Sequence, residues 1–240
     1  MSARALLAVA SLMLAPLAPQ AQYRVHRTSA PRSDLLAAVD SSWALAPRIT
    51  WGPAAYETAF RAAWDEHGLF LRFDATDPGP WHRMTKRDEH LWEEEVVEIF
   101  LDLDRSGTQY YELEINPANV VCDLRMISPW PKKEGDIGFD LPGLETRVHT
   151  RGDAGKTTGW TATAFLPWDG FRPLPSARAV ALPPRPGDAW RFNVFRIKRP
   201  GGPQAPEPEK DAVFAAWSKP PGESFHMPEA FRDFVFEAAR

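Results

Sequence analysis

The chain has 240 residues, of which 44% are hydrophobic and 25% are charged, a balance that predicts a sizeable folded core. Its net charge is −4 with both signs interspersed, so neither a basic stripe for nucleic acid nor a polybasic surface for a membrane is present. The 24 prolines argue against long helices, and the 10 tryptophans are enough for both a large core and an exposed stacking surface.

The N-terminus has the pattern of an export signal. Arg4 precedes an apolar run over residues 5–14, and alanines and prolines follow up to Ala21. The run is too short to span a membrane, so we predict a signal peptide over residues 1–21 and no membrane span. We expect an exported protein, periplasmic or extracellular, whose residues 22–240 form a single domain because no shift in composition divides them.

Cys122 is the only cysteine in the chain. An intrachain disulfide and a multi-cysteine metal site are therefore excluded. A free cysteine is often a small buried hydrophobe, and we expect that role here.

The first part of the mature chain predicts an extended segment, a short helix and a hairpin. Residues 23–34 are polar and extended, and Asp40 or Ser41 can begin a helix that places Trp43 at the edge of the domain. Residues 56–65 alternate between apolar and polar types, and residues 69–75 return as the second strand of a hairpin.

The next stretch, Trp92 to Asp104, joins an aromatic residue and several carboxylates to a β-type apolar run. We predict a strand from about Val96 to Leu103. Glu98 is unusual inside this run, because a buried carboxylate needs a hydrogen-bond partner, a cation or a ligand.

The remaining chain contains further short alternating segments, separated by turns rich in proline and glycine. The predicted strands are residues 110–116, 120–127, 144–150, 159–166, 190–199, 213–218 and 231–236. With about ten strands and minimal helix, the sequence predicts an all-β fold, a two-sheet antiparallel β-sandwich of the jelly-roll or immunoglobulin-like kind.

Five ordered motifs in the chain resemble carbohydrate-binding modules of family 9. They lie at residues 92–100 (WEEEVVEIF), 110–116 (YYELEIN), 159–168 (GWTATAFLPW), 190–196 (WRFNVFR) and 216–231 (AWS with FHMPEAF). The resemblance spans roughly Asp34 to the C-terminus, and the order and spacing of the motifs carry it.

The resemblance implies a β-sandwich that binds the ends of oligo- or polysaccharide chains without catalysis. Trp92 takes the position of one stacking aromatic and Glu98 that of a sugar-contacting carboxylate. Phe225 stands where the family places its second stacking tryptophan, and Glu114 stands where it places an arginine. We expect Arg196 to supply that missing guanidinium from a neighbouring strand.

The resemblance also implies structural calcium and an attached or associated glycoside hydrolase in polysaccharide or xylan catabolism. Asp74, Asp77, Asp102 and Asp104 lie near strand ends and offer oxygen ligands, but none of their spacings identifies a calcium site, and we assign no metal ligands.

The other aromatics divide into surface and core candidates. Trp81 and Trp130 lie in loops and could extend a binding surface. The remaining tryptophans are expected in the core: Trp43, Trp64, Trp160, Trp168, Trp190 and Trp217.

Two alternative functions remain open at this point. Glu98 with Glu112 or Glu114 could form the acid/base pair of a glycoside hydrolase. A haem-binding electron-transfer β-sandwich could use methionine and histidine ligands, although no haem-attachment motif is present. The candidate haem ligands are Met126, His226 and Met227. No nucleophile-elbow or phosphate-loop motif occurs.

Overall fold

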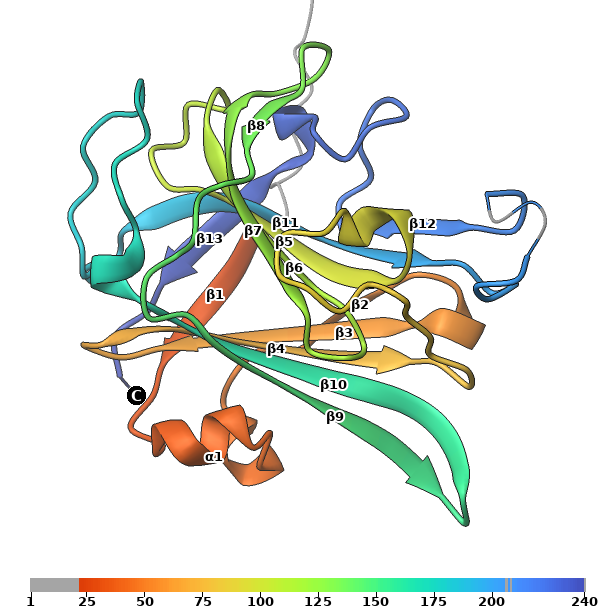
Figure 1. Ribbon diagram of the computed structural model, residues 1–240. Coiled ribbons are helices and arrows are strands. Elements are labelled where there is room, and N and C mark those ends of the chain that lie inside the picture. The colour runs from red at the N-terminus through yellow and green to blue at the C-terminus, as the bar shows by residue number, and fades with distance from the viewer. Residues whose placement is uncertain (1–21, 206, 208, 240) are drawn as a thin grey trace, which may run out of the picture.

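The computed structural model describes residues 22–205, 207 and 209–239, so the predicted signal peptide lies outside the described residues (Figure 1). The described chain is nearly all β, which confirms the predicted fold class. Its strands are β1 (Gln22–Arg27), β2 (Ile49–Trp51), β3 (Thr58–Trp64), β4 (Gly68–Thr76), β5 (Val96–Asp102), β6 (Tyr110–Ile115), β7 (Val121–Ser128), β8 (Glu134–Asp136), β9 (Glu145–Asp153), β10 (Lys156–Pro167), β11 (Ala189–Lys198), β12 (Val213–Ala216) and β13 (Arg232–Phe236).

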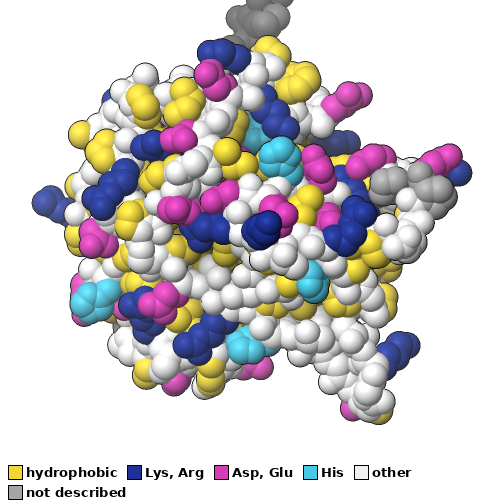
Figure 2. Space-filling view, viewed as in Figure 1, with side chains coloured by type: hydrophobic (Ala, Val, Ile, Leu, Met, Phe, Trp, Pro, Cys, Tyr) yellow, Lys and Arg dark blue, Asp and Glu magenta, His cyan; other side chains and the backbone are white. Residues whose placement is uncertain are grey.

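The helical elements are short. They are the α-helix α1 (Arg32–Leu36) and the 3₁₀ turns η1 (Asp40–Trp43), η2 (Ala54–Tyr56), η3 (Leu91–Glu93), η4 (Trp168–Gly170) and η5 (Pro228–Ala230). No helix in the described part of the chain is long and apolar enough to cross a bilayer. On the face seen in Figure 2, acidic and basic side chains are interspersed, as the composition predicts.

The strands form one continuous hydrogen-bonded ladder. Its order is β8-β7-β6-β5-β11-β13-β1-β3-β4-β10-β9, with β12 added to β11 and β2 added to β3. Strand β1 pairs with both β13 and β3, and both pairings are parallel. The predicted arrangement of purely antiparallel sheets therefore needs correction, because β1 joins the two halves of the ladder and does so in parallel.

The main core lies between these two halves. Phe60 of β3 and Phe192 of β11 come from different halves, and their ring centroids are 5.9 Å apart. Both side chains are fully buried. Since side chains alternate between the faces of a strand, every second residue of β5, β6 and β11 points into this core.

The opposite face of β5, β6, β7 and β11 is also covered. A second apolar cluster there includes Phe100, Phe195 and Phe231. The strands are consequently buried on both faces, which explains why β5 and β6 are buried at every position. The candidate site lies on this second face.

Several local predictions needed revision. The helix begins earlier than predicted, at Arg32, and Asp40–Trp43 forms only a 3₁₀ turn. Trp43 is 1% exposed, so it packs in an interior cluster and not at an edge. The stretch between the predicted strands at residues 120–127 and 144–150 contains the short strand β8. The expectation for Cys122 is confirmed, since this thiol is fully buried.

Candidate functional site

The acidic residues before β5 have different roles in the fold. The carboxylate of Glu94 accepts backbone hydrogen bonds from Arg83 and Met84, which orders the preceding loop. The carboxylate of Glu95 is buried against the ammonium of Lys198, at 2.5 Å. These two acids are therefore structural, and Glu98 is the carboxylate of β5 that faces a cavity.

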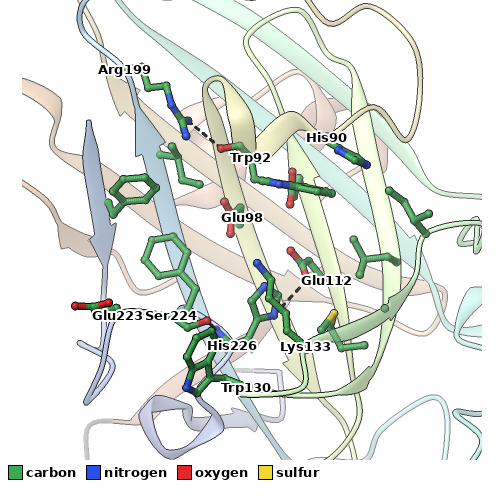
Figure 3. A pocket seen from close by; sticks show the side chains of 18 residues that line it. His90, Trp92, Glu98, Glu112, Trp130, Lys133, Arg199, Glu223, Ser224 and His226 are labelled. Carbon is green, nitrogen blue, oxygen red and sulfur yellow. Dashed lines mark hydrogen bonds and ion pairs between the residues drawn. The ribbon is translucent and has the colours of Figure 1, made fainter. Parts of the chain in front are cut away.

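The cavity has a volume of about 510 Å³, in the range of small-molecule sites. It lies on the outer face of β5, β6, β7 and β11, between η3 and the loops around β8 and residues 223–226 (Figure 3). Its lining consists of His90, Trp92, Glu98, Glu112, Glu114, Leu124, Met126, Trp130, Lys133, Gly135, Ile137, Ile197, Arg199, Phe214, Glu223, Ser224, Phe225 and His226.

Strand register brings three carboxylates together on the floor of the cavity. Glu98 of β5 lies directly opposite Glu114 of β6, and Glu112 lies two positions along the same strand face. One carboxylate oxygen from each of the three lies within 4.8 Å of the others. Their exposed fractions are 2% for Glu98, 5% for Glu112 and 0% for Glu114.

This carboxylate group is electrostatically strained. Burial raises the pKa of Glu98 and of Glu114 well above the usual range, and the neighbouring carboxylates raise both further. Burial also raises the pKa of Glu112 to about 7. The group therefore holds protons near neutral pH unless a cation or a donor-rich ligand stabilises the charged forms.

His226 and Lys133 border the carboxylates. The Nδ1 atom of His226 lies 3.0 Å from the hydroxyl of Tyr110 and 3.8 Å from Glu112 Oε2. Burial, with the charge of Lys133, lowers the pKa of His226 to about 3, so the imidazole is neutral. The exposed Lys133 reaches into the cavity from the loop before β8 (Figure 3), and its charge lowers the pKa of all three glutamates.

Two aromatic side chains of the cavity stack on neighbouring rings. Trp92 stacks on His90, which also lines the cavity, with ring centroids 4.5 Å apart. Phe225 stacks on Phe195 with centroids 4.3 Å apart. Such support fixes the ring planes before a ligand arrives, and this reduces the entropy lost on binding.

The structure brings Trp92, Glu98, Glu114 and Phe225 to one cavity, but it does not bring Arg196 there. Arg196 is fully buried, and its guanidinium donates to Asp77 at 2.7 Å. It points into the core between the two halves of the ladder, 5.1 Å from the ring of Trp160. The reason is strand alternation, since the residues of β11 that face the cavity have odd numbers. The predicted sugar contact through Arg196 is thus corrected.

Arg199 is the arginine that lines the cavity. Its NH1 donates to the backbone carbonyls of Trp92, at 2.9 Å, and Glu94, at 2.6 Å. Its Nε and NH2 donate to Glu209. Arg199 therefore holds η3, and with it Trp92, against the end of β11.

The residues that the sequence did not assign to the site come mainly from loops. Glu112 was foreseeable as a lining residue, because the alternation of residues 110–116 places it on the same face as Glu114. Lys133 and His226 gave no such signal, because their loop segments have no regular period, and Phe214 lies on β12, a strand too short to show which face meets the cavity. Trp130 lines the cavity and is 52% exposed.

Trp81 does not line the cavity. Its indole nitrogen donates to the backbone carbonyl of Arg199 at 2.8 Å, and Arg83 lies over its ring. Its contacts fix the loop before η3, which is a structural role.

The four aspartates considered for calcium do not form a fitting ligand set. Asp74 is bound by Arg72 through several hydrogen bonds, and Asp77 is bound by Arg196 and Lys198. Asp102 keeps one buried oxygen without a hydrogen-bond partner, and Asp104 accepts hydrogen bonds from two backbone amides. One free oxygen is far short of the six to eight ligands typical of calcium.

The two alternative functions find little support in the cavity. A glycoside hydrolase needs two carboxyl groups on opposite sides of the scissile bond, whereas Glu98, Glu112 and Glu114 stand side by side on one wall. Met126 and His226 both line the cavity, but His226 Nδ1 is engaged by Tyr110 and three carboxylates occupy the floor, where an apolar haem face would have to lie.

Comparison with known proteins agrees with this architecture. A curated relative from Arthroderma benhamiae, named "Extracellular protein", is 26% identical over 191 residues, which cover 75% of this chain and 78% of the relative. A candidate carbohydrate-binding protein from Bacteroides uniformis has a similar structure, with a TM-score of 0.69 and 16% identity over 91% of this chain and 100% of that chain.

A family 9 carbohydrate-binding module from Caldicellulosiruptor kristjanssonii was solved with cellotriose and with glucose. Both structures match with a TM-score of 0.62 and 15% identity over 92% of this chain, and the match covers 95% and 97% of their own chains. At such identities the likeness shows the shared fold. The family described as carbohydrate family 9 binding domain-like matches residues 38–168, more than half of the chain. The chain therefore belongs to the carbohydrate family 9 binding domain-like family.

Proposed function

We propose that this protein is a non-catalytic carbohydrate-binding protein that takes the end of a sugar chain into the cavity beside Trp92. The observation that carries the proposal is the combination of supported aromatic rings with buried carboxylates around one cavity of about 510 Å³. A sugar ring presents an apolar C–H face to aromatic planes and hydroxyl groups to carboxylates.

The residues have distinct roles in this proposal. Trp92 and Phe225 pack against the faces of the sugar, and Glu98 and Glu114 accept hydrogen bonds from its hydroxyls. Trp130, at the rim and half exposed, extends the surface toward a second sugar unit. Arg199 keeps Trp92 in position through its backbone hydrogen bond.

The proposed setting is outside the cytoplasm. The signal-peptide pattern of residues 1–21 and the relative named as an extracellular protein both support export. We also propose a role beside a polysaccharide-degrading glycoside hydrolase, in the periplasm or the medium, because the family resemblance implies such a partner. Co-purification of such an enzyme with the exported protein is the test of this partnership.

A glycan-binding screen followed by calorimetry tests the function. We expect binding of an oligosaccharide such as cellobiose or xylobiose, and a Trp92→Ala variant that binds about tenfold more weakly, since an aromatic contact contributes about 1 kcal/mol or more. Phe225→Ala should weaken binding less, because its ring offers a smaller plane.

Leu45→Ala is the matched control, because Leu45 is 59% exposed and lies outside the cavity lining. It should bind like the wild type. Failure of the wild type to bind any glycan, or equal binding by Trp92→Ala, would overturn the proposed function.

A further inference from the structure

The cavity is lined by more acidic side chains than lysine and arginine side chains. Its charged lining consists of four carboxylates and two cations, namely Glu98, Glu112, Glu114, Glu223, Lys133 and Arg199. Arg199 already donates to Glu209 and to two backbone carbonyls. Of the two lining cations, Lys133 alone is left to face the carboxylate floor, so the floor favours a positively charged ligand.

The floor also contains oxygens that need donors. Glu98 Oε1, Glu112 Oε2 and both oxygens of Glu114 have no hydrogen-bond partner among the described residues. All three side chains are at least nine-tenths buried. Leaving buried carboxylates unpaired is costly, so a ligand that supplies several donors at once gains more here than in an open site.

The spacing of the carboxylates is compatible with a protonated amine. One oxygen from each of Glu98, Glu112 and Glu114 lies within 4.8 Å of the other two. Three acceptors placed about 2.8 Å from one ammonium nitrogen, along its tetrahedral N–H directions, are about 4.6 Å apart. An ammonium group has three donors for the three carboxylates, whereas a sugar hydroxyl has one.

Building on the proposed carbohydrate binding, we infer that the preferred ligand is the end of an amino-sugar chain with a free, protonated amino group. The ammonium lies among Glu98, Glu112 and Glu114, and the sugar ring packs against Trp92. This assignment explains why the floor of a sugar cavity is built from three carboxylates and backed by a neutral histidine instead of an arginine.

A divalent cation fits the same floor less well. Calcium takes six to eight oxygen ligands, and the cavity lining contains no aspartate, asparagine or glutamine to add to the three glutamates. Lys133 repels a doubly charged ion more strongly than a singly charged ammonium. The aromatic rings of Trp92 and Phe225 offer no ligand atoms to a bare metal ion, whereas they can pack against a sugar ring.

A matched series of disaccharides tests the inference on the full chain. Cellobiose, the β-1,4 dimer of glucosamine and its di-N-acetylated form differ only at C2, which carries a hydroxyl, an ammonium or an acetamide. By calorimetry near pH 6.5 we expect the glucosamine dimer to bind about tenfold more tightly than the other two, because hydrogen bonds to charged groups are about twice as strong as neutral ones. Binding should also release protons from the protein, which repetition in buffers of different ionisation enthalpy measures.

Glu114→Gln keeps the shape of the side chain and removes its charge. It should abolish the preference for the glucosamine dimer, and it should weaken the binding of cellobiose much less than the binding of that dimer. Glu98→Gln should also reduce the preference for the glucosamine dimer. Circular dichroism checks that both variants fold. Glu66→Gln is the matched control, because Glu66 is exposed in the β3–β4 turn, outside the cavity lining, and this variant should keep the preference.

The possible results separate the two proposals. If cellobiose binds as tightly as the glucosamine dimer, or if Glu114→Gln keeps the preference, the amino-sugar inference is wrong and the carbohydrate function stands. If none of the three sugars or the screened glycans binds, both are wrong. A calorimetric titration with calcium chloride alone that shows binding, lost in Glu114→Gln, would assign the floor to a metal ion and overturn the inference.

Discussion

Two buried charge clusters lie on opposite faces of β5 and β11, and they are built in opposite ways. In the first cluster, between the halves of the ladder, Arg196 and Lys198 are paired with Asp77 and Glu95 at distances of 2.5 to 3.9 Å. In the second, at the cavity, Glu98, Glu112 and Glu114 carry the same sign and leave oxygens unpaired.

The difference separates a structural cluster from a binding one. The first cluster balances its charges within the protein, so it has nothing to offer a ligand. The second keeps an excess of acidic groups where a cavity gives access to them. Buried polar groups that lack partners beside a cavity are typical of functional sites. They lower the stability of the free protein, and a ligand that pairs with them offsets this cost.

The largest effect should come from breaking the balanced cluster. Arg196→Leu leaves Asp77 and Glu95 buried with only Lys198 as a counter-charge, so we expect a loss of about 3–5 kcal/mol in the free energy of unfolding. Chemical denaturation at pH 7 measures it.

Arg24→Leu is the surface control for Arg196→Leu. It removes an exposed ion pair with Glu237, and it should cost less than about 1 kcal/mol. If the two variants were equally stable, Arg196 would not be held in a low-dielectric interior, and the contrast between the clusters would fail.

The second effect concerns the pH dependence of the unbalanced cluster. The pKa of Glu112 is raised from 4.5 to about 7 in the folded protein, so its protonated form stabilises the fold below pH 4.5 and this contribution is lost as the pH rises through 7. Relative to the Glu112→Gln variant, the free energy of unfolding of the wild type should fall by about 3 kcal/mol between pH 4.5 and 7, since a shift of one pKa unit corresponds to about 1.4 kcal/mol.

Urea denaturation at several pH values, with Glu223→Gln from the exposed rim as control, measures this difference. The free energy of unfolding of the control should change with pH in the same way as that of the wild type. A wild type that becomes more stable than Glu112→Gln as the pH rises would show that the carboxylates are paired in solution.

The smallest expected effect concerns Lys133, the lining cation that faces the carboxylates, and its influence on ligand affinity. Lys133→Gln removes a positive charge that competes with a cationic ligand, so we expect the glucosamine dimer to bind about threefold more tightly. The effect is small because Lys133 is exposed and screened by solvent. Calorimetry measures it, and weaker binding would mean that Lys133 contacts the ligand directly.

Much of the fold could be predicted because alternation is a local property. The period of two in residues 56–65, 110–116 and 120–127 identified β3, β6 and β7. The short strands β2 and β8 were missed, because three residues are too few to show a period. The parallel pairings of β1 were beyond local reasoning, since they join residues about 40 and 210 positions apart in the chain.

The candidate site was predicted in part for the same reason. Trp92, Glu98, Glu114 and Phe225 converge as the motifs indicate, whereas Arg196 faces the other way. The error came from counting Arg196 as available without following alternation along β11, which puts Phe195, Ile197 and Arg199 on the cavity side.

The all-β class, the family and the carboxylate in the middle of a buried strand could be inferred from the chain alone, because they depend on residue order and on period. Which charges share a face depends on how the chain folds in three dimensions. Register sets Glu98 opposite Glu114, and distant loops bring His226 and Lys133 beside them. Whether a buried carboxylate is neutralised within the fold or left for a ligand depends on its neighbours in space, and these come from segments far apart in the chain.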